Sequence, residues 1–324
     1  MRDKIIECAK KYDADIIGFA PADRFSPDDE IFKIFPETKT VIGMGFRVLR
    51  GIYRGAEEGT TYYQYTTMGV ENLEETVMPL ALINVSNLVE DEGFIVVPQR
   101  RNQLIMNDTI GTNPEVDYTD VVRGIEAEHQ IDFLNCAVMC GLGEKSMIDS
   151  LLTPEYGPFI RYCFILTDAE IEATEIVNAG LCDKCGECIK ACPGGAIDED
   201  GKLDSWRCAV YYNGANGSKN PFMPPDAFPD FENRMDIING TAEFDDEEAK
   251  EILNSIYFYP PAKHYYRTSI CGRACDRACY IHLEEKGVLT KSFKRKFREG
   301  KDWKLSTKQF ETMKREKEWD FTKN

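Results

Sequence analysis

The chain has 324 residues, of which 43% are hydrophobic and 29% are charged, a composition typical of soluble globular proteins. Its formal net charge of −17 argues against general nucleic-acid binding, and no apolar run approaches the roughly 18 residues that a membrane span needs. The N-terminal residues show neither the apolar core of a signal peptide nor a twin-arginine leader, so we expect a cytoplasmic protein without membrane association.

The first 178 residues alternate between helical and strand-like patterns. Apolar residues recur at helical spacing over 5–12, 73–88 and 131–138, and short apolar or β-branched runs cover 15–21, 41–46, 94–98 and 159–168. Pro79 must kink or restart the second helix, and Gly141 can cap the third. This interleaving predicts a layered α/β or α+β domain over residues 1–178.

Residues 179–285 differ in composition. They contain short elements, many cysteines and a loop-rich stretch, with one expected helix at 247–256. We interpret them as a second domain, followed by a tail over 286–324. The tail carries 13 Lys and Arg against 6 Asp and Glu, a net charge of +7, which leaves −24 on the remainder.

The basic tail has an apolar side formed by Phe293, Phe297 and Trp303. An amphipathic helix that packs on the acidic body is therefore expected. Contact of the tail with RNA or with an acidic partner is the alternative.

Twelve cysteines in a chain without an export signal point to metal binding rather than disulfides. The first run, Cys182, Cys185, Cys188 and Cys192, has the spacing C-x2-C-x2-C-x3-C-P. In this pattern three close cysteines bind one iron–sulfur cluster, and the fourth reaches a second cluster. Zinc sites normally use two separated C-x2-C pairs instead, so iron–sulfur chemistry is favoured.

A second cluster needs four more ligands, and the chain offers Cys208, Cys271, Cys275 and Cys279. Swapped ligation then gives two [4Fe–4S] sites. The first would use Cys182, Cys185, Cys188 and Cys279. The second would use Cys192, Cys208, Cys271 and Cys275. The other four cysteines are expected to be small buried apolar residues; they are Cys8, Cys136, Cys140 and Cys163.

Two clusters in succession require an electron acceptor. The N-terminal domain has no G-x-G-x-x-G after a strand and no phosphate-binding P-loop, so a nicotinamide or nucleotide site is unsupported. Another cofactor in that domain, or direct delivery to a substrate, is implied.

Three stretches resemble the epoxyqueuosine reductase and reductive dehalogenase superfamily: AVMCGLGEKSMIDSLLTPEYGPFIRYCFILTD, the ferredoxin-type cysteine run, and the lone cysteine before AVYY. The resemblance covers most of residues 10–285. It implies a nitroreductase-like, cobalamin-binding domain joined to a ferredoxin-like domain with two [4Fe–4S] clusters. It places the corrin against Tyr63, Gly141, Leu142, Gly143, Thr153, Pro154, Tyr156 and Gly157. The pattern of these residues also predicts a helix cap and turns.

The resemblance also implies a proton donor near Ala127, which makes Glu128 and Asp132 candidates for a general acid. Tyr65 is another candidate, because a tyrosine serves in the dehalogenases. The alternative interpretation is a solvated helix surface for the carboxylates and a packed aromatic turn for the tyrosine.

The favoured hypothesis is a cobalamin-dependent iron–sulfur reductase. Ferredoxin or flavodoxin would donate the electrons, and the substrate would be a small molecule or a modified nucleoside, with tRNA possible. Two alternatives remain open: a ferredoxin-like electron-transfer protein without its own catalytic cofactor, and a flavin-dependent reductase.

Overall fold

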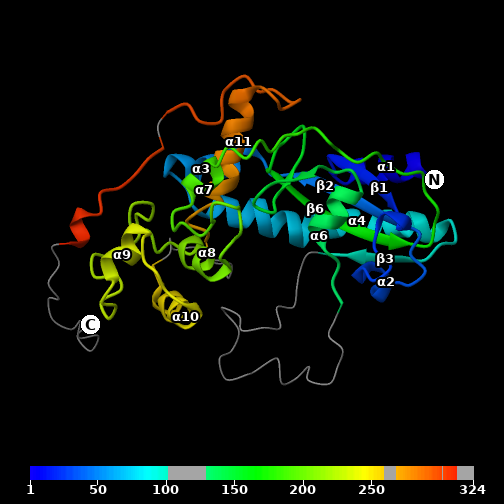
Figure 1. Cartoon of the computed structure of the whole chain (residues 1–324). Helices are drawn as coiled ribbons and strands as arrows, with labels where there is room; N and C mark the ends of the chain where they lie inside the picture. The colour runs from blue at the N-terminus through cyan, green and yellow to red at the C-terminus, as the bar shows by residue number, and fades with distance from the viewer. Residues whose placement is uncertain (101–128, 259–267, 301, 312–324) are drawn as a thin grey trace, which may run out of the picture.

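The computed structural model describes residues 1–100, 129–258, 268–300 and 302–311 (Figure 1). In these ranges no helix is both long enough and apolar enough to cross a membrane.

A four-stranded antiparallel sheet forms the centre of the N-terminal part. Its strands, in spatial order, are β1 (Ile16–Pro21), β2 (Thr40–Arg47), β6 (Ile160–Thr167) and β3 (Val96–Gln99). The central pair, β2 and β6, is aligned over the full length of both strands. All but one residue of each central strand is buried, which fits continuous apolar runs covered on both faces. The strands predicted at 15–21, 41–46, 94–98 and 159–168 are confirmed.

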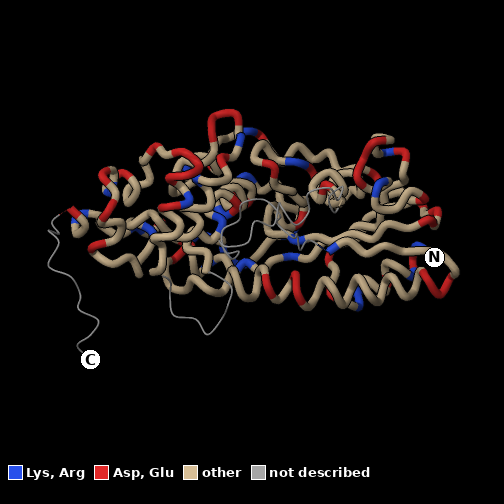
Figure 2. The backbone as a smooth tube through the Cα atoms, turned by 90° about the horizontal axis from the view of Figure 1, so that it is seen from below, with Lys and Arg blue, Asp and Glu red and all other residues tan. Residues whose placement is uncertain are grey.

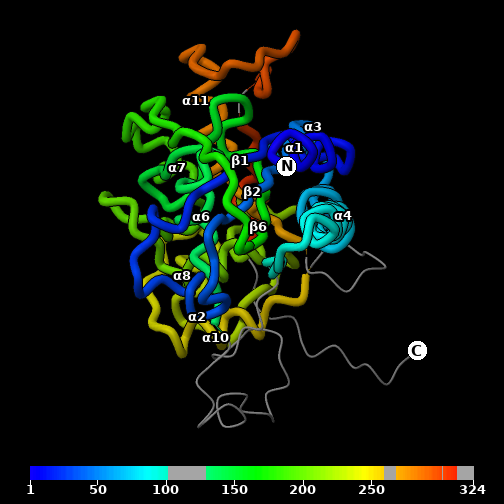
Figure 3. The backbone as a smooth tube through the Cα atoms, turned by 90° about the vertical axis from the view of Figure 1, so that its right-hand side faces the viewer, coloured from blue at the N-terminus to red at the C-terminus, as the bar shows by residue number. Residues whose placement is uncertain are grey.

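Helices cover both faces of this sheet (Figure 3). On one face lie α1 (Arg2–Lys11) and α4 (Met78–Asp91), where Ile5 and Val85 pack with Ile42 of β2. On the other face lie α2 (Glu30–Ile34) and α6 (Phe133–Met139). The mixed α/β class predicted from the sequence is therefore confirmed.

The chain between β2 and α4 is mostly helical but irregular. It contains α3 (Arg50–Glu58) and two π-helical segments, Tyr65–Glu71 and Leu73–Val77. Regular α-helix resumes at α4, where Pro79 occupies the first turn. The change from π-helical to α-helical geometry falls next to this proline, so the predicted restart of this helix is confirmed.

The cysteine-rich part consists of short helices joined by loops. They are α7 (Glu187–Ala191), α8 (Ser205–Tyr212), α9 (Arg234–Asn239), α10 (Asp246–Ser255) and α11 (Ala274–Lys286). The helix predicted at 247–256 is α10, which begins with a capping box between Asp245 and Glu248. A short ribbon of β4 (Glu144–Lys145) and β5 (Leu151–Leu152) leads from α6 toward these helices. Two 3-10 turns complete the elements, Ala22–Arg24 and Lys308–Phe310.

The prediction of a helical tail is wrong for the described residues after α11, which contain only the 3-10 turn at Lys308–Phe310. Basic side chains at 291, 294, 295 and 298 would repel one another at helical spacing. The predicted packing on the body is confirmed for Phe297, which is 2% exposed, whereas Phe293 is 43% exposed. Figure 2 shows that acidic residues are spread along the whole of the described chain.

Candidate metal centre

The first set of cysteines converges on one cavity. Cys182, Cys185, Cys188 and Cys279 all line it. Cys188 lies on α7 and Cys279 on α11, and these two helices pack against each other. Cys185 is exposed, so this set is close to the protein surface.

The second set lines a separate cavity, formed by Cys192, Cys208, Cys271 and Cys275. Cys192 is the C-cap of α7 and Cys208 lies on α8. Cys271 precedes α11, and Cys275 lies in its first turn. The placement of the eight cysteines is the one that swapped ligation predicts.

The two cavities are neighbours. Ile148 and Ser150 line both of them. Cys275 and Cys279 are one turn apart on α11, which corresponds to a rise of about 6 Å, yet each belongs to a different set. Metal groups bound at the two sets would therefore lie close together.

Burial determines the ionisation of these thiols. It raises the pKa of Cys188 and Cys271, and it raises the pKa of Cys208 to about 11. These groups are protonated at neutral pH until a metal ion displaces the proton. Backbone N–H groups already point at three of the sulfurs: Ala196 N lies 3.2 Å from Cys192 Sγ, Met147 N lies 3.4 Å from Cys182 Sγ, and Ala274 N lies 3.4 Å from Cys271 Sγ. Two all-sulfur sets of four fit the ligand requirement of [4Fe–4S] clusters.

The remaining cysteines lie away from both sets. Cys136, Cys140 and Cys163 are fully buried around the sheet, as predicted. Cys8 is only partly buried and packs against the same core.

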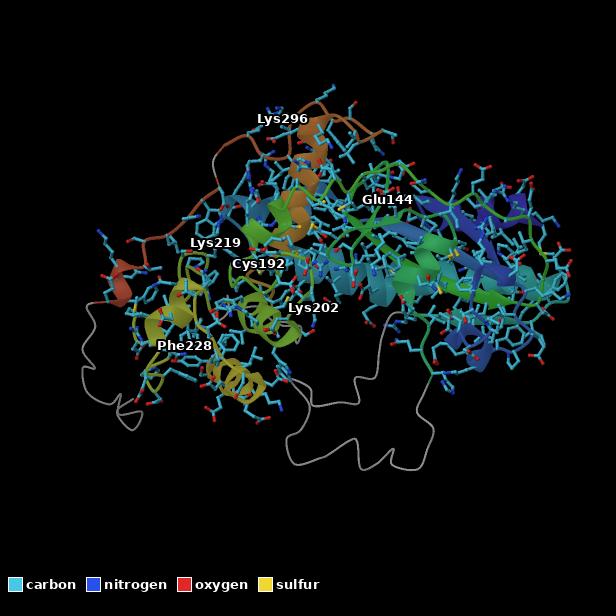
Figure 4. All side chains as sticks on the ribbon, viewed as in Figure 1. Glu144, Cys192, Lys202, Lys219, Phe228 and Lys296 are labelled. Atoms are coloured by element: carbon cyan, nitrogen blue, oxygen red, sulfur yellow. The ribbon has the colours of Figure 1, made fainter. Side chains whose placement is uncertain are left out.

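Glu144, on β4, positions the backbone that leads into the first set, a role that was not predicted. Its carboxylate accepts hydrogen bonds from four consecutive N–H groups, those of residues 179–182. The first two distances are 2.9 Å and 3.0 Å, and the fourth donor is the N–H of Cys182 itself. Figure 4 shows Glu144 between α11 and the strands of the central sheet in that view.

Charged side chains alternate with the cysteines at the start of α11. Arg273 Nε donates to Asp276 Oδ2 at 2.7 Å, and Asp276 Oδ1 accepts from Ser150 Oγ at 3.2 Å. Asp276 is 4% exposed and lines the first cavity. The run CGRACDRAC, in which charges alternate with cysteines, is the sequence feature that could have indicated this network.

Arg277 connects the second set to α3. Its Nη1 lies 2.5 Å from Glu57 Oε2, and its Nη2 donates to the carbonyl oxygen of Cys271 at 2.9 Å. Both charged side chains are more than nine-tenths buried. Arg298 of the tail contacts the other carboxylate oxygen of Glu57, so two guanidinium groups share one carboxylate.

Of the three predicted proton donors, the structure describes Asp132 and Tyr65, and it places them in different surroundings. Glu128 lies outside the described residues. Asp132 is exposed, and its carboxylate accepts from Asn135 N at 2.9 Å as the N-cap of α6. Tyr65 is 2% exposed, and its hydroxyl lies 2.5 Å from Arg161 Nη2.

The predicted corrin contacts at the end of α6 are occupied by protein. Gly141 has φ +72° and ends the helix, because its N–H bonds to Val138 O and that of Leu142 bonds to Ala137 O. A Cβ at Gly141 would lie 2.2 Å from Glu175 O, and one at Gly143 would lie 2.3 Å from the carbonyl oxygen of Leu152. Both glycines are required by close backbone approaches within the chain.

The second predicted corrin loop, residues 153–157, is a tight turn held by paired backbone bonds between Thr153 and Gly157. Pro154 O accepts from Thr290 N at 2.8 Å. Tyr156 OH lies 3.2 Å from Asp15 Oδ1. Tyr63, the remaining predicted contact, lies in the helical turn before the first π-helical segment and is 45% exposed. Of the residues predicted to contact a corrin, Tyr156 lines a cavity of about 240 Å³ together with Phe159 and Tyr280.

The largest of the four cavities described has a volume of about 460 Å³ and adjoins the second set. Cys192 and Cys271 line both this cavity and that of the second set. Its other walls come from α3, α7, the start of α11, the loop after α8 and the tail. Figure 4 labels Cys192 and Lys219, which both line it.

Comparison with known proteins supports iron–sulfur binding at the first cysteine run. Residues 175–198 match the 4Fe-4S binding domain family. The epoxyqueuosine reductase of Bacillus subtilis is 23% identical over 256 residues, which cover 72% of this chain and 60% of the relative. The trichloroethene reductive dehalogenase of Dehalococcoides mccartyi is 36% identical over 83 residues, which cover 24% of this chain and 15% of the relative.

The chain is thus similar to members of the epoxyqueuosine reductase and reductive dehalogenase superfamily. The resemblance inferred from the sequence is thereby confirmed. The chain spans less than two thirds of the length of either relative.

Solved structures of the same two groups are also similar. An epoxyqueuosine reductase structure from Bacillus subtilis has a TM-score of 0.43 and 14% identity, with coverage of 89% of this chain and 82% of the other. A reductive dehalogenase structure, described as suggesting a mechanism for B12-dependent dehalogenation, has a TM-score of 0.46 and 16% identity, with coverage of 96% and 42%.

Proposed function

We propose that this chain is an iron–sulfur reductase that holds one [4Fe–4S] cluster on each set of four cysteines. The observation that carries the proposal is the convergence of eight cysteines, from three separate stretches of chain, on two adjacent cavities. Bound clusters supply one-electron transfer. The match of residues 175–198 to a 4Fe-4S binding family supports the same chemistry.

The positions of the two sets indicate the direction of electron flow. The first set includes the exposed Cys185, so we infer that a ferredoxin or flavodoxin donates electrons there, in the cytoplasm. The second set adjoins the 460 Å³ cavity through Cys192 and Cys271, which makes that cavity the candidate site of the acceptor. The names of the relatives make an epoxyqueuosine-type nucleoside, free or in tRNA, or an organohalide the substrates to test first.

The chemical test is iron and sulfide analysis after anaerobic reconstitution. We expect about eight iron atoms per chain in the unmodified protein and about four in Cys208→Ser or Cys279→Ser, because each variant loses a ligand of a different cluster. Cys163→Ser is the matched control and should keep about eight. Zinc in place of iron, or full iron in Cys208→Ser together with half-loss in Cys163→Ser, would overturn the assignment. Turnover by the reduced protein should then be compared on epoxyqueuosine-tRNA and on haloaromatic compounds.

A second candidate is an electron-transfer protein without its own catalytic cofactor. It is favoured by the tight packing of Gly141 and Gly143 on backbone carbonyls, where a corrin was predicted. The reconstituted protein should be mixed with cobalamin and desalted. Complete loss of the corrin spectrum supports this candidate, whereas retention of about one corrin per chain shows that a cobalamin site exists elsewhere. A yellow chromophore in the purified protein would instead indicate a flavin.

A further inference from the structure

The 460 Å³ cavity beside the second cysteine set is strongly cationic in an otherwise acidic protein. Five cationic side chains line it against two acidic ones, a net charge of +3 in a chain of −17. They are Lys190, Lys219, Arg277, Arg298 and Lys304 against Glu57 and Asp302. A concentration of one sign of charge in a cavity raises the local concentration of ions of the opposite sign.

Internal ion pairs use only part of this charge. Lys219 Nζ lies 2.6 Å from Asp302 Oδ2, which neutralises one pair. Arg277 and Arg298 both pair with Glu57, so these three side chains together carry a net charge of +1. The carboxylate of Glu57 is only 4% exposed. Burial lowers the pKa of Lys219, whereas the carboxylate of Asp302 raises it. The positive charges of Arg277 and Lys304 lower this pKa further, so the cations are close enough to repel one another.

Two of the five cations have donors to spare. All three guanidinium nitrogens of Arg277 already have acceptors. Its Nε and Nη2 donate to the carbonyl oxygens of Gly272 and Cys271, and its Nη1 donates to Glu57. Arg298 uses only its Nε, and its side chain is one-third exposed. In the described part of the chain its two terminal nitrogens have no acceptor, and neither has the ammonium of Lys304. A guanidinium fork beside an ammonium group is the donor set that phosphate and carboxylate groups require.

We propose that this cavity binds a small molecule through its phosphate or carboxylate group, held by Arg298 and Lys304. The cavity has the size of small-molecule sites, about 300–1,000 Å³, and its wall includes Cys192 and Cys271. The ligand therefore lies next to the second cysteine set. Only this last feature rests on the proposed function; anion binding does not depend on whether the cysteines hold iron.

The binding test uses radiolabelled inorganic phosphate in equilibrium dialysis against the anaerobically purified full chain. One site per chain is expected, with affinity that falls as salt is raised. Arg298→Gln should weaken phosphate binding at least tenfold and Lys304→Gln about threefold, whereas Arg298→Lys, which keeps the charge, should lose less than Arg298→Gln. The matched control is Lys308→Gln, which removes an exposed charge of the same tail outside the cavity and should bind normally. Equal weakening in Lys308→Gln, or no binding to the unmodified protein, overturns the proposal.

The location test uses the reduced, iron-loaded protein. Phosphate bound beside the second set should show faster ³¹P relaxation, because a reduced cluster is paramagnetic, and the enhancement should disappear in Arg298→Gln. If phosphate does not bind and Arg298→Gln only lowers the midpoint potential of a cluster, the cationic wall balances cluster charge and the proposal is wrong. If the protein holds no iron, the proposed function fails, while dialysis still decides on anion binding.

Discussion

Single charged residues position the cysteine loops, and Glu144 is the clearest case. Its carboxylate accepts the N–H groups of residues 179–182, the segment that delivers Cys182 to the first set. Hydrogen bonds to a charged acceptor contribute about 1.5–3 kcal/mol each, and unpaired buried donors are costly.

We predict that Glu144→Gln lowers the free energy of unfolding by about 1–3 kcal/mol, because the amide loses the charge and one acceptor oxygen. It should also speed the loss of iron to a chelator from the first set, measured in a Cys208→Ser background that retains only that cluster. Glu175→Gln removes an exposed carboxylate nearby and should change neither value. Equal iron loss in both variants would contradict a positioning role for Glu144.

The buried pair of Arg277 and Glu57 acts on the second set. Arg277→Met leaves a buried carboxylate with one cation fewer and frees the Cys271 carbonyl oxygen. We expect the free energy of unfolding in urea to fall by about 3–5 kcal/mol. Arg54→Met is the control, because the acidic partners of Arg54, Glu58 and Glu299, are each over 40% exposed, and its loss should cost at most about 1 kcal/mol. Similar costs for the two variants would show that the buried pair contributes no more than a surface pair.

At the scale of elements, two helices end in the same way in different surroundings. Gly141 ends α6 and Gly287 ends α11, with φ +72° and +67° and the same pair of backbone hydrogen bonds. A Cβ at Gly141 would lie 2.2 Å from a carbonyl oxygen, while one at Gly287 would meet nothing within 4 Å. Alanine substitutions at these two glycines therefore separate the free-energy cost of a left-handed backbone from the free-energy cost of a steric clash.

We predict that Gly287→Ala lowers the free energy of unfolding by about 1–2 kcal/mol, the cost of the left-handed conformation alone. Gly141→Ala should cost about 3 kcal/mol or more, because the clash is added. Both free energies of unfolding are measured by chemical denaturation of the cobalamin-free protein. If Gly141→Ala is no worse than Gly287→Ala, the close approach to Glu175 is loose, and a ligand-facing role for Gly141 regains support.

The regular elements could be predicted from the sequence because their causes are local. The apolar runs of β2 and β6 and the proline at the start of α4 each determine structure within a few residues. The division of the eight cysteines into two sets could be predicted from their spacing and their number. Glu144 could not be predicted, because it contacts backbone groups 35 to 38 residues away, and Arg277 pairs with Glu57 across 220 residues. The prediction of a tail helix was wrong because Phe297 packs against distant residues. The N–H of Phe297 donates to Glu284 Oε2 at 2.7 Å rather than to a helical carbonyl oxygen.

At the scale of the whole molecule, one aromatic cluster joins the three segments into which the sequence was divided. Phe159 comes from the N-terminal part, Tyr280 from α11 and Phe297 from the tail. The rings of Phe159 and Tyr280 stack at 4.3 Å, and Phe297 packs edge-on against both. Because this cluster is shared, the three segments should unfold together in one transition.

Phe297 therefore offers a test of how the tail contributes to the assembled molecule. We predict that Phe297→Ala lowers the free energy of unfolding by about 3–5 kcal/mol, since a 2% exposed ring is removed from a shared core. Phe293→Ala, four residues earlier and 43% exposed beneath the guanidinium of Arg50, should cost less than about 1 kcal/mol. Denaturation followed by far-ultraviolet circular dichroism and by cluster absorbance should give coincident transitions in the unmodified protein. If Phe297→Ala unfolds like Phe293→Ala, or if the two probes separate before any mutation, the tail is an accessory and the cysteine-rich part is stable without it.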